Sequence, residues 1–494
     1  KNAPLPVVVE TEYLHLAEHL EDLERLHRRY RTYKVEKNLF DYDDLLLELR
    51  DLLAARRDVA ERLSSELRFV MVDEYQDTNR LQADIVERLA VAHRNVMAVG
   101  DDAQSIYSFR GADFRNIMEF ERRFPGARVI ALEENYRSTQ PILDLANAVI
   151  ERAAERYTKV LRTRLAEGAT PLLVQAESES FQSRFVCQRI LELREEGVPL
   201  EEIAVLFRSS YHSFDLELEL ARADLPFVKR GGFKFVESAH VKDLVAHLRV
   251  AVNPRDTVSW LRVLLLLEGV GPKRAGEMLE AIAAAGGDPA PLRAAAGGRW
   301  KGAREEVGRL AALLAALAAE QPPPQAALER AMVHYEPILK RVHPDDYPRR
   351  AKDLEHLVTL AARYRSVETM LADFALEPPS DAVGGTLAEA ADEGRLTLST
   401  VHSAKGLEWH TVFVIWAAEG RFPAQYSAAD EAEFEEERRL FYVAITRAKR
   451  LLYVSYPIQY FERGAGLAFG RPSRFVAGLP EPLLKPMTLV EEGI

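Results

Sequence analysis

Short runs of hydrophobic residues alternate along the chain with longer stretches in which hydrophobic residues recur at helical spacing. Phe69–Val72 is one such run and ends in Asp73–Glu74, and Val96–Val99 is another and ends in Gly100–Asp101. A stretch with helical spacing, from about Arg80 to Ala92, separates the two runs. Short buried strands that alternate with helices are typical of a parallel α/β sheet, whose chemistry lies at the carboxyl ends of its strands.

The same pattern recurs in the rest of the chain, so the sequence predicts a second α/β core. Further hydrophobic runs that we expect to be strands are Val129–Leu132, Ile203–Phe207, Leu396–Leu398, Val412–Ile415 and Leu451–Val454. Between about Ser238 and Asp392 the pattern changes to Leu- and Ala-rich stretches with helical spacing and no strand-like runs. We therefore predict a helical insertion domain within the second core.

Composition fits a folded chain of several domains. A length of 494 residues predicts two to four domains. Hydrophobic residues make up 47% and charged residues 29%, which argues against wholesale disorder. The formal net charge of −12 argues mildly against nucleic-acid binding, because phosphates attract Lys and Arg. Net charge is a sum over the whole chain, however, and is compatible with a local basic channel.

The cysteine content and the absence of long hydrophobic runs indicate a cytoplasmic protein. Cys187 is the single cysteine, so no intrachain disulfide can form, which is typical of a reducing compartment. Hydrophobic runs such as Val263–Leu267 are too short to span a bilayer, and no signal peptide is visible. The chain starts with Lys1 rather than Met, which predicts that its natural N-terminus is missing.

The acidic segment Asp73–Asp77 is the strongest local motif. A strand that ends in adjacent Asp and Glu is typical of the site where nucleoside triphosphatases hold Mg²⁺ and activate water. Asp73 would then bind the Mg²⁺ shell, and Glu74 would act as the general base. The alternative is a strand whose acidic end simply faces solvent, and the acidic pair alone would favour it. The sequence Tyr75–Asp77 that follows favours the catalytic interpretation.

Two further segments carry candidate chemistry. In the segment Val99–Ala112, Gln104 could sense a γ-phosphate, while two aromatic residues alternate with Arg110, a mixture suited to stacking single-stranded bases. Arg447, at the start of a late helix, is a candidate arginine finger, a group worth ~10³ to 10⁵ in rate. Taken singly, the aromatic residues could be core residues and Arg447 a solvated side chain.

The order of the motifs settles their interpretation. Asp-Glu-Tyr-Gln-Asp-Thr, Gly-Asp…Gln-Ser-Ile-Tyr…Arg-Gly-Ala, Asn-Tyr-Arg-Ser, Thr-x-His-x-x-Lys-Gly-Leu-Glu and Val-Ala-Ile-Thr-Arg-Ala follow one another along the chain. This series resembles UvrD/Rep/PcrA-type superfamily 1 DNA helicases over nearly the whole length. Phe40–Leu46 and Gly231–Phe235 also match the family. Five long motifs in register are very specific.

The resemblance implies an α/β fold with two RecA-like parallel-sheet cores, the first incomplete, and a helical insertion domain in the second. It implies an ATP- and Mg²⁺-dependent 3′-to-5′ DNA helicase or translocase that acts on single-stranded DNA and on single-strand/double-strand junctions such as forks. It also implies a role in DNA repair, recombination or replication, partners among repair or replication proteins, and a nucleoid-associated, cytoplasmic location without membrane contact.

Residue roles carry over from the family where the motifs match. Asp73 and Glu74 would serve the metal and water, and Gln104 would contact the γ-phosphate. The residues implied to reach the rest of the nucleotide are Arg137 and Arg447 for the phosphates, Tyr136 for adenine and Glu408 for ribose.

The resemblance also implies a set of DNA contacts. Tyr107, Phe109 and Arg110 match single-strand contacts, Arg208 matches a backbone-phosphate contact, and Thr400 and His402 match residues that couple DNA to the ATP cleft. In the insertion, Leu267–Arg274 resembles a helix-hairpin-helix turn, in which Gly269, Gly271 and Lys273 would approach a DNA phosphate. A simple Gly-rich interhelical turn is the alternative for this segment.

The sequence also departs from the family pattern. Phe109 stands where many relatives carry Trp, and Ser210 stands where Asn is more usual, which puts one phosphate contact in doubt. The phosphate-binding motif G-x-x-x-x-G-K-[ST] does not occur in the 494 residues. We therefore expect that the P-loop part of the first core is absent, and that the chain alone does not hydrolyse ATP.

These observations together predict five segments and leave two interpretations open. Residues 1–37 are the tail of an accessory helical domain, 38–130 a partial first core, 131–237 the first part of the second core, 238–392 the helical insertion and 393–494 the second part of that core. The chain is interpreted as a helicase with an N-terminal truncation. The alternatives are a non-catalytic DNA- or protein-binding scaffold derived from a helicase and, less favoured, a partner polypeptide that supplies the P-loop.

Overall fold

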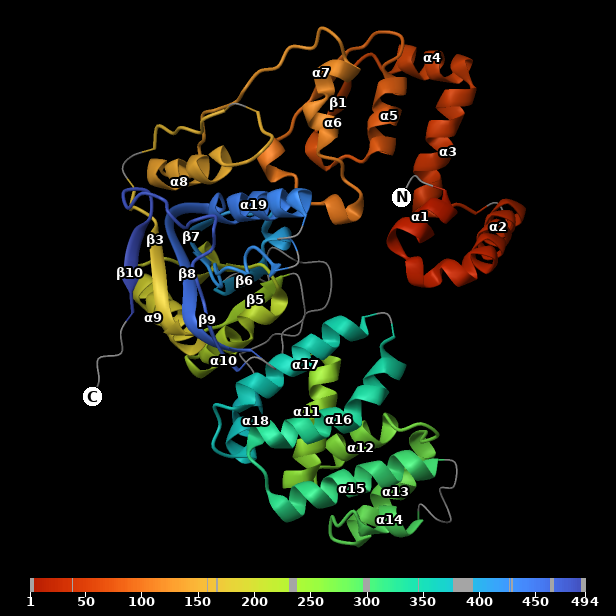
Figure 1. The fold of residues 1–494 in the computed structure, drawn as a ribbon, viewed down its shortest axis with the longest axis vertical. Coiled ribbons are helices and arrows are strands. Elements are labelled where there is room, and N and C mark those ends of the chain that lie inside the picture. Colours follow the sequence, from red (N-terminus) through yellow and green to blue (C-terminus); the bar gives the residue numbers. More distant parts are fainter. Residues whose placement is uncertain are drawn as a thin grey trace. The chain divides into compact units, whose positions relative to one another are not determined.

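The computed structural model describes residues 4–37, 39–157, 159–165, 168–230, 238–295, 303–344, 346–375, 394–425, 427, 430–462 and 466–489. The family segment Gly231–Phe235 therefore lies outside the described residues. The chain forms two compact units (Figure 1). Unit 1 consists of residues 1–135, 147–162 and 429–443, and unit 2 of residues 136–146, 163–428 and 444–494. The five-segment division made from the sequence stays a prediction.

Unit 1 is mainly helical, with a small parallel sheet. Its helices are α1 (Leu5–Glu12), α2 (Leu20–Lys37), α3 (Tyr42–Ala55), α4 (Arg57–Glu66), α5 (Arg80–Leu89), α6 (Arg115–Met118) and α7 (Phe120–Arg123). Two of them begin with capping boxes that satisfy the free backbone N–H groups of the first turn. Asp41 and Asp44 form the box of α3, and Asn79 and Gln82 form that of α5.

The sheet of unit 1 joins β1 (Val70–Val72) and β2 (Val96–Ala98) in parallel. Both strands were predicted, but their expected burial is wrong. Met71 and Met97 are 75% and 58% exposed. They pair in register and therefore share one face of the sheet, because side chains alternate across a strand. The described part of the chain leaves that face open.

The strand predicted at Val129–Leu132 is also wrong. This segment is extended but belongs to no strand, and Ile130 and Leu132 are 66% and 77% exposed. The chain pairs only just beyond it, where Glu134 forms an isolated bridge with Arg162. A hydrophobic run becomes a strand only where a neighbouring backbone bonds it, and no described strand pairs with this one.

Unit 2 contains a large parallel sheet, which confirms the predicted α/β class. The strand order is β10-β3-β8-β7-β4-β6-β5, all neighbours are parallel, and β9 adds an antiparallel pair to β8. The strands are β3 (Leu172–Ser178), β4 (Ile203–Phe207), β5 (Phe227–Arg230), β6 (Leu396–Thr400), β7 (Trp409–Val414), β8 (Ala448–Glu462), β9 (Gly466–Phe469) and β10 (Lys485–Thr488). Every residue of β4 is buried, as expected for a central strand covered on both faces.

Helices cover this sheet and connect its strands. α9 (Glu179–Glu195) packs against β3 and β8, and α10 (Phe214–Arg222) packs against α9 (Figure 1). Their buried residues form one core with the strands. α8 (Gln140–Glu151) and α19 (Glu431–Ile445) each begin in one unit and end in the other.

The described residues between 238 and 375 are helical, as the pattern predicted. They form α11 (Ala239–Val252), α12 (Thr257–Leu265), α13 (Pro272–Ala284), α14 (Ala290–Ala295), α15 (Arg304–Glu320), α16 (Pro324–Val342), α17 (Tyr347–Ala361) and α18 (Val367–Ala375). These helices surround a hydrophobic core in which Trp260 and Tyr335 are almost completely buried, and Phe214 and Leu218 of α10 join this core. This core is what a helical insertion needs in order to fold beside a sheet.

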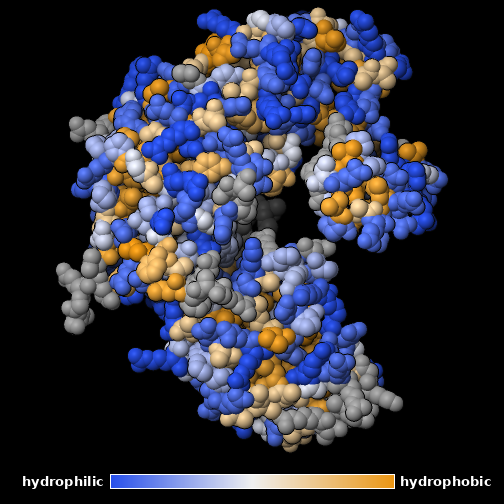
Figure 2. Space-filling model, in the orientation of Figure 1, coloured by the Kyte–Doolittle hydropathy of each residue, from blue (hydrophilic) through white to orange (hydrophobic). Residues whose placement is uncertain are grey.

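None of the described helices is both long and apolar enough to cross a bilayer. On the face drawn in Figure 2, hydrophilic residues dominate and hydrophobic residues form small, separate patches.

Leu206 tests the contribution of the central strand. It is completely buried in β4, so Leu206→Ala should lower the free energy of unfolding of unit 2 by about 2–5 kcal/mol. All four tryptophans belong to unit 2, so their fluorescence during urea unfolding reports this unit. Val333→Ala, at a position 76% exposed on α16, is the control and should change the free energy by less than about 0.5 kcal/mol. Equal effects of the two variants would contradict the assigned core.

Candidate nucleotide and DNA sites

The acidic motif lies at the carboxyl end of β1, with Asp73 and Glu74 exposed. The backbone turns sharply here, because Glu74 has φ 51° and ψ 41°, in the left-handed region. A non-glycine residue in this region costs about 1–3 kcal/mol and is held only where its surroundings fix it. The carboxylate of Glu74 accepts a hydrogen bond from Nε2 of Gln76 at 2.5 Å, and its backbone N–H donates to Asp73 at 2.9 Å.

The side chain of Gln76 joins this turn to the end of β2. Gln76 is completely buried, and its Oε1 accepts a hydrogen bond from the backbone N–H of Asp101 at 3.0 Å. Gly100 makes this approach possible, because a Cβ at that position would lie 2.5 Å from Oε1 of Gln76. The two strand ends therefore meet at one place, and the requirement for glycine at position 100 is steric.

Gln104, the candidate γ-phosphate sensor, follows β2 and is held by a charged cluster. Its Nε2 donates to Oδ2 of Asp101 at 2.8 Å. Lys159 pairs with both Asp101 and Asp102, the latter at 2.9 Å. Burial alone would lower the pKa of Lys159, but the two carboxylates outweigh burial and raise the pKa. Lys159 therefore stays charged and fixes the loop that carries Gln104, a role that its sequence context did not indicate.

Asp73 and Glu74 fit a magnesium ion only as part of a larger ligand set. Mg²⁺ is usually held by one or two carboxylates together with waters and substrate phosphates. Two exposed carboxylates at a strand end meet this requirement. Elsewhere, the described residues contain no group of three or more His, Cys, Asp or Glu side chains that could hold a metal. The arrangement therefore suits a metal that arrives with a nucleotide.

The candidate DNA-stacking residues form a compact group after Gln104. The rings of Tyr107 and Phe109 lie 6.0 Å apart at 60°. The guanidinium of Arg110 lies 5.1 Å from the first ring and 5.5 Å from the second. Phe109 is 65% exposed, so its face is available to a base. The structure thus brings together the three residues that the sequence grouped.

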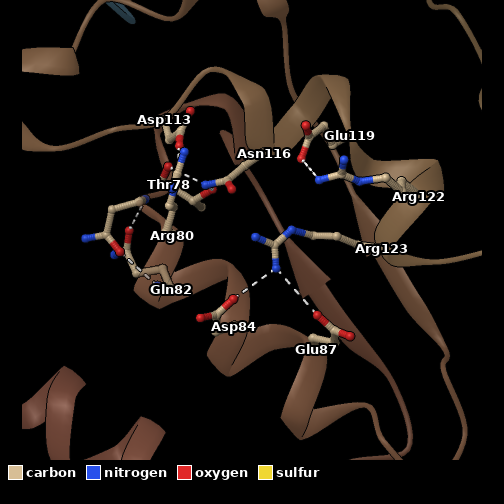
Figure 3. Close-up of polar contacts among 11 residues, drawn as sticks. Thr78, Arg80, Gln82, Asp84, Glu87, Asp113, Asn116, Glu119, Arg122 and Arg123 are labelled. Atoms are coloured by element: carbon tan, nitrogen blue, oxygen red, sulfur yellow. Dashed lines mark hydrogen bonds and ion pairs between the residues drawn. The ribbon is translucent and has the colours of Figure 1, made fainter. Parts of the chain in front are cut away.

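A polar network ties this loop to the helix that follows the acidic motif (Figure 3). Asn116 donates to the carbonyl of Thr78 at 2.9 Å, and Arg80 pairs with Asp113 at 2.6 Å. Arg123 reaches back from α7 to Asp84 on α5 at 3.0 Å. The segments after β1 and β2 are therefore cross-linked. The turn at Asp73–Glu74 and the loop that carries Tyr107, Phe109 and Arg110, called the aromatic loop from here on, thus keep a fixed spacing within unit 1.

In unit 2, Arg137 and Glu408 form an ion pair. Nε of Arg137 donates to the carboxylate of Glu408 at 2.5 Å. This hydrogen bond lowers the pKa of Glu408, burial opposes it, and the charges of Arg137 and Lys449 lower the pKa further. A carboxyl whose pKa is lowered by folding stabilises the fold above its ordinary pKa, and the effect fades as the pH falls through the folded-state value.

A pocket of about 530 Å³ lies beside this pair, lined by Tyr136, Arg137, Glu202, His410 and Lys449 among others. Tyr136 is 79% exposed, which leaves its ring free to stack. Lys449 bridges Glu202 and Glu408 at 3.4 Å and 3.6 Å. The sequence did not indicate Lys449, although it lies only two residues after the predicted arginine finger.

Arg447 lies between the end of α19 and the start of β8, so its predicted place at the start of a helix is wrong, and it is buried rather than presented to solvent. It is 2% exposed, and its guanidinium donates to the carbonyl of Leu407 and to Oγ1 of Thr446, both at 3.2 Å. In this conformation the side chain stabilises the segment before β7 instead of reaching outwards. Contact with a nucleotide would require the guanidinium to leave these partners.

The candidate DNA contacts of unit 2 lie at one edge of its sheet. Phe207 and Thr400 pair in register on the neighbouring strands β4 and β6, so Arg208 and His402 follow adjacent strand ends. Oγ1 of Thr400 bonds Ser403 at 3.1 Å and holds the turn that carries His402. The structure thus brings Arg208, Thr400 and His402 to the same carboxyl edge.

The candidate helix-hairpin-helix turn links α12 and α13. Leu267 and Val270 are buried and anchor it, while Lys273 is exposed in the first turn of α13. Gly269 has φ 77°, a conformation that favours glycine, and Gly271 precedes the helix with open space around its Cα. The turn can therefore bring backbone N–H groups close to an anion.

Comparison with known proteins identifies the family. Residues 9–125 match the UvrD/REP helicase N-terminal domain, and residues 130–284 together with 327–459 match the UvrD-like helicase C-terminal domain. The second match alone covers more than half of the chain. This protein therefore belongs to the UvrD/PcrA-type DNA helicase family.

Its curated relatives include proteins named ATP-dependent DNA helicase PcrA. The chain is 32% identical over 483 residues to the protein of Staphylococcus aureus strain Mu50, and 33% identical over 468 residues to that of Bacillus subtilis strain 168. Each match covers 90% of this chain and 62% of the relative. The relative from Leuconostoc citreum is 32% identical, with 61% of its length covered. The chain thus spans less than two thirds of the length of these relatives.

Gly100→Ala tests the junction between the strand ends. The added Cβ would displace the amide of Gln76, so we expect unit 1 to lose about 1–3 kcal/mol of stability. Hydrogen exchange followed by mass spectrometry should show faster exchange in peptides covering residues 70–78 and 96–105. Gly308→Ala, in α15 with open space around it, is the matched control and should leave these peptides unchanged. Unchanged exchange in Gly100→Ala would contradict the steric argument.

Proposed function

We propose that this protein is the larger part of an ATP-driven 3′-to-5′ DNA helicase, and that both units act on ATP and on single-stranded DNA. The observation that supports this most strongly is the coincidence of chemistry and topology. In each unit, the motif residues of the family follow the carboxyl ends of parallel strands, at Asp73–Glu74 in unit 1 and at Arg208 and Thr400–His402 in unit 2. Ligands of parallel α/β sheets bind at such edges.

For hydrolysis, we assign the reacting end of ATP to unit 1. Bound Mg²⁺ would neutralise charge on the phosphates. Asp73 would hold the metal shell, and Glu74 would accept a proton from the attacking water. Gln104 would contact the γ-phosphate. Its side-chain amide is already oriented by the hydrogen bond from Nε2 to Oδ2 of Asp101 at 2.8 Å. The strained backbone at Glu74 supports this role, since strain of this kind clusters at functional sites.

For nucleotide binding, we assign the base, ribose and remaining phosphate contacts to unit 2. The exposed ring of Tyr136 would stack on adenine, and Glu408 would bind ribose. Arg137 would exchange its bond to Glu408 for a phosphate. Arg447 would first have to leave Leu407 and Thr446, so we assign it to the transition state rather than to initial binding.

For DNA, we propose two kinds of contact. Tyr107, Phe109 and Arg110 would stack on and neutralise a single strand, as aromatic and Arg side chains do in proteins that bind single strands. Arg208, Thr400 and His402 would bind it at the edge of the second sheet. The hairpin turn with Gly269, Gly271 and Lys273 would bind the backbone of the duplex ahead of the junction.

Glu74→Gln tests the catalytic assignment in the protein expressed from its complete coding sequence. DNA-stimulated ATP hydrolysis should fall by about 10²- to 10⁴-fold, because a glutamine cannot accept the proton. Arg447→Ala should lower the rate by ~10³-fold or more. Glu66→Gln, an exposed glutamate at the end of α4, is the matched control and should keep the wild-type rate. Full activity in both Glu74→Gln and Arg447→Ala would refute the assigned roles.

Tyr136→Ala tests the nucleotide pocket separately from catalysis. Loss of base stacking should raise the KM for ATP by about fivefold to a hundredfold, with a much smaller change in kcat. Tyr136→Phe keeps the ring and should behave like the wild type. A wild-type KM in Tyr136→Ala would exclude stacking on this ring.

The 494-residue chain by itself contains no G-x-x-x-x-G-K-[ST] motif, so we propose that it does not hydrolyse ATP alone. The scaffold alternative is distinguished by the same assay. A complete protein that binds single-stranded DNA but never hydrolyses ATP would support the scaffold. Unwinding of a duplex with a 3′ tail, but not of one with a 5′ tail, would establish the polarity.

A further inference from the structure

Ser108 lies between the two candidate DNA-stacking residues and is already bound to an anion, the carboxylate of Glu436. The backbone N–H of Ser108 donates to Oε1 of Glu436 at 3.2 Å, and its hydroxyl donates to Oε2. Both residues belong to unit 1, and Ser108 is exposed. One carboxylate thus uses two adjacent donors on the aromatic loop.

The position of these donors is the unusual feature. Tyr107 and Phe109 flank Ser108 on the chain, and the guanidinium of Arg110 lies within 5.5 Å of both rings. A strand that stacks its bases on two rings must run its phosphates close to the backbone between them. Phosphate and carboxylate oxygens accept the same hydrogen bonds, so a phosphate could use the donors that Glu436 now uses.

The surroundings of Glu436 are strongly acidic. A pocket of about 700 Å³ opens beside Ser108, and its wall contains Asp430, Glu431, Glu433 and Glu435 from the start of α19 and the residue before it, together with Arg115 and Arg439. These carboxylates oppose the approach of a phosphate, and Glu436 is the one among them that bonds Ser108. The carboxylates of this pocket therefore lie next to the aromatic loop, and Glu436 contacts it directly.

Glu436 is held in place by the helix that carries it. Arg439, one turn further along α19, donates from Nε to the carbonyl of Ser105 at 2.9 Å. The same guanidinium lies 4.6 Å from the ring centroid of Phe114. α19 is thus fixed to residues on both sides of the aromatic loop, so Glu436 keeps its position relative to Ser108.

We propose that Ser108 is a phosphate contact for single-stranded DNA, and that Glu436 is an internal carboxylate that occupies this contact when DNA is absent. DNA must displace Glu436 in order to bind fully. The inference rests on the proposed function, because it takes the aromatic loop to be a DNA site. It adds a contact and a competing residue that determine how tightly the loop binds a strand.

The test is the affinity of the 494-residue chain for a fluorescent oligothymidylate about 16 nucleotides long, measured by anisotropy. Glu436→Gln keeps the shape of the side chain and removes its charge, so binding should tighten by about threefold to tenfold at low salt. The gain should shrink as salt rises, because salt screens the repulsion. Glu433→Gln removes the same charge from the same pocket wall but not from Ser108, and should tighten binding much less.

Ser108→Ala tests the contact itself. In the Glu436→Gln background it should weaken binding by roughly threefold to tenfold, because the phosphate loses a hydroxyl donor. In the wild-type background the loss should be smaller, because Glu436 already competes for that donor. Thermal unfolding of each variant identifies any that are misfolded, and the isosteric Glu436→Gln keeps the test valid if Ser108→Ala is unstable.

The outcomes separate the two proposals. If Glu436→Gln binds DNA no tighter than the wild type, or no tighter than Glu433→Gln, the proposal that DNA displaces Glu436 from Ser108 is wrong. The proposal that the aromatic loop binds DNA is not affected by this result. If Ser108→Ala leaves the affinity of Glu436→Gln unchanged, the phosphate contact is wrong. If the chain and all its variants fail to bind the oligonucleotide, the aromatic loop is not a DNA site, and the proposed function fails with it.

Discussion

The side-chain amide of Gln76 connects the two strand ends on which the chemistry of unit 1 depends. It donates to Glu74, accepts from the backbone of Asp101, and is completely buried. A buried amide that lost either partner would be destabilised by the cost of an unsatisfied polar group, about 1–3 kcal/mol. Gln76 therefore links the carboxylate at the end of β1 to the start of the loop that holds Gln104, and Gly100 is required so that Gln76 fits.

The sequence predicts this topology well where local pattern determines it. Runs such as Ile203–Phe207 became central strands because a continuous hydrophobic run is stable only when covered on both faces. The hydrophobic pattern failed to predict strands correctly where hydrogen bonding to a neighbouring strand decides whether a segment forms one. Val129–Leu132 has the composition of a strand but no neighbour to bond it among the described residues. β3, β5, β9 and β10 were not predicted, and β10, an exposed edge strand, has no hydrophobic run at all.

The candidate site residues also divide into those that the local sequence indicates and those that depend on contacts between distant parts of the chain. Asp73 and Thr400 lie at strand ends, where the hydrophobic runs before them placed them, and their roles stay predictions. Lys159 and Glu436 were missed because they reach the motifs from distant parts of the chain, across 58 and 328 positions. Nothing in the residues around them indicates a partner so far away. Arg447 was identified by its motif, yet its inward conformation follows from packing that the motif does not encode.

Helix α19 gives this arrangement a mechanical consequence. Glu436 and Arg439 are three residues apart on α19, and both bond the segment 105–108. Continuous hydrogen-bonded backbone joins the two residues, so they move together. A rotation of this part of the helix that takes Glu436 away from Ser108 therefore also strains the bond of Arg439 to Ser105, and the two contacts are made and broken together.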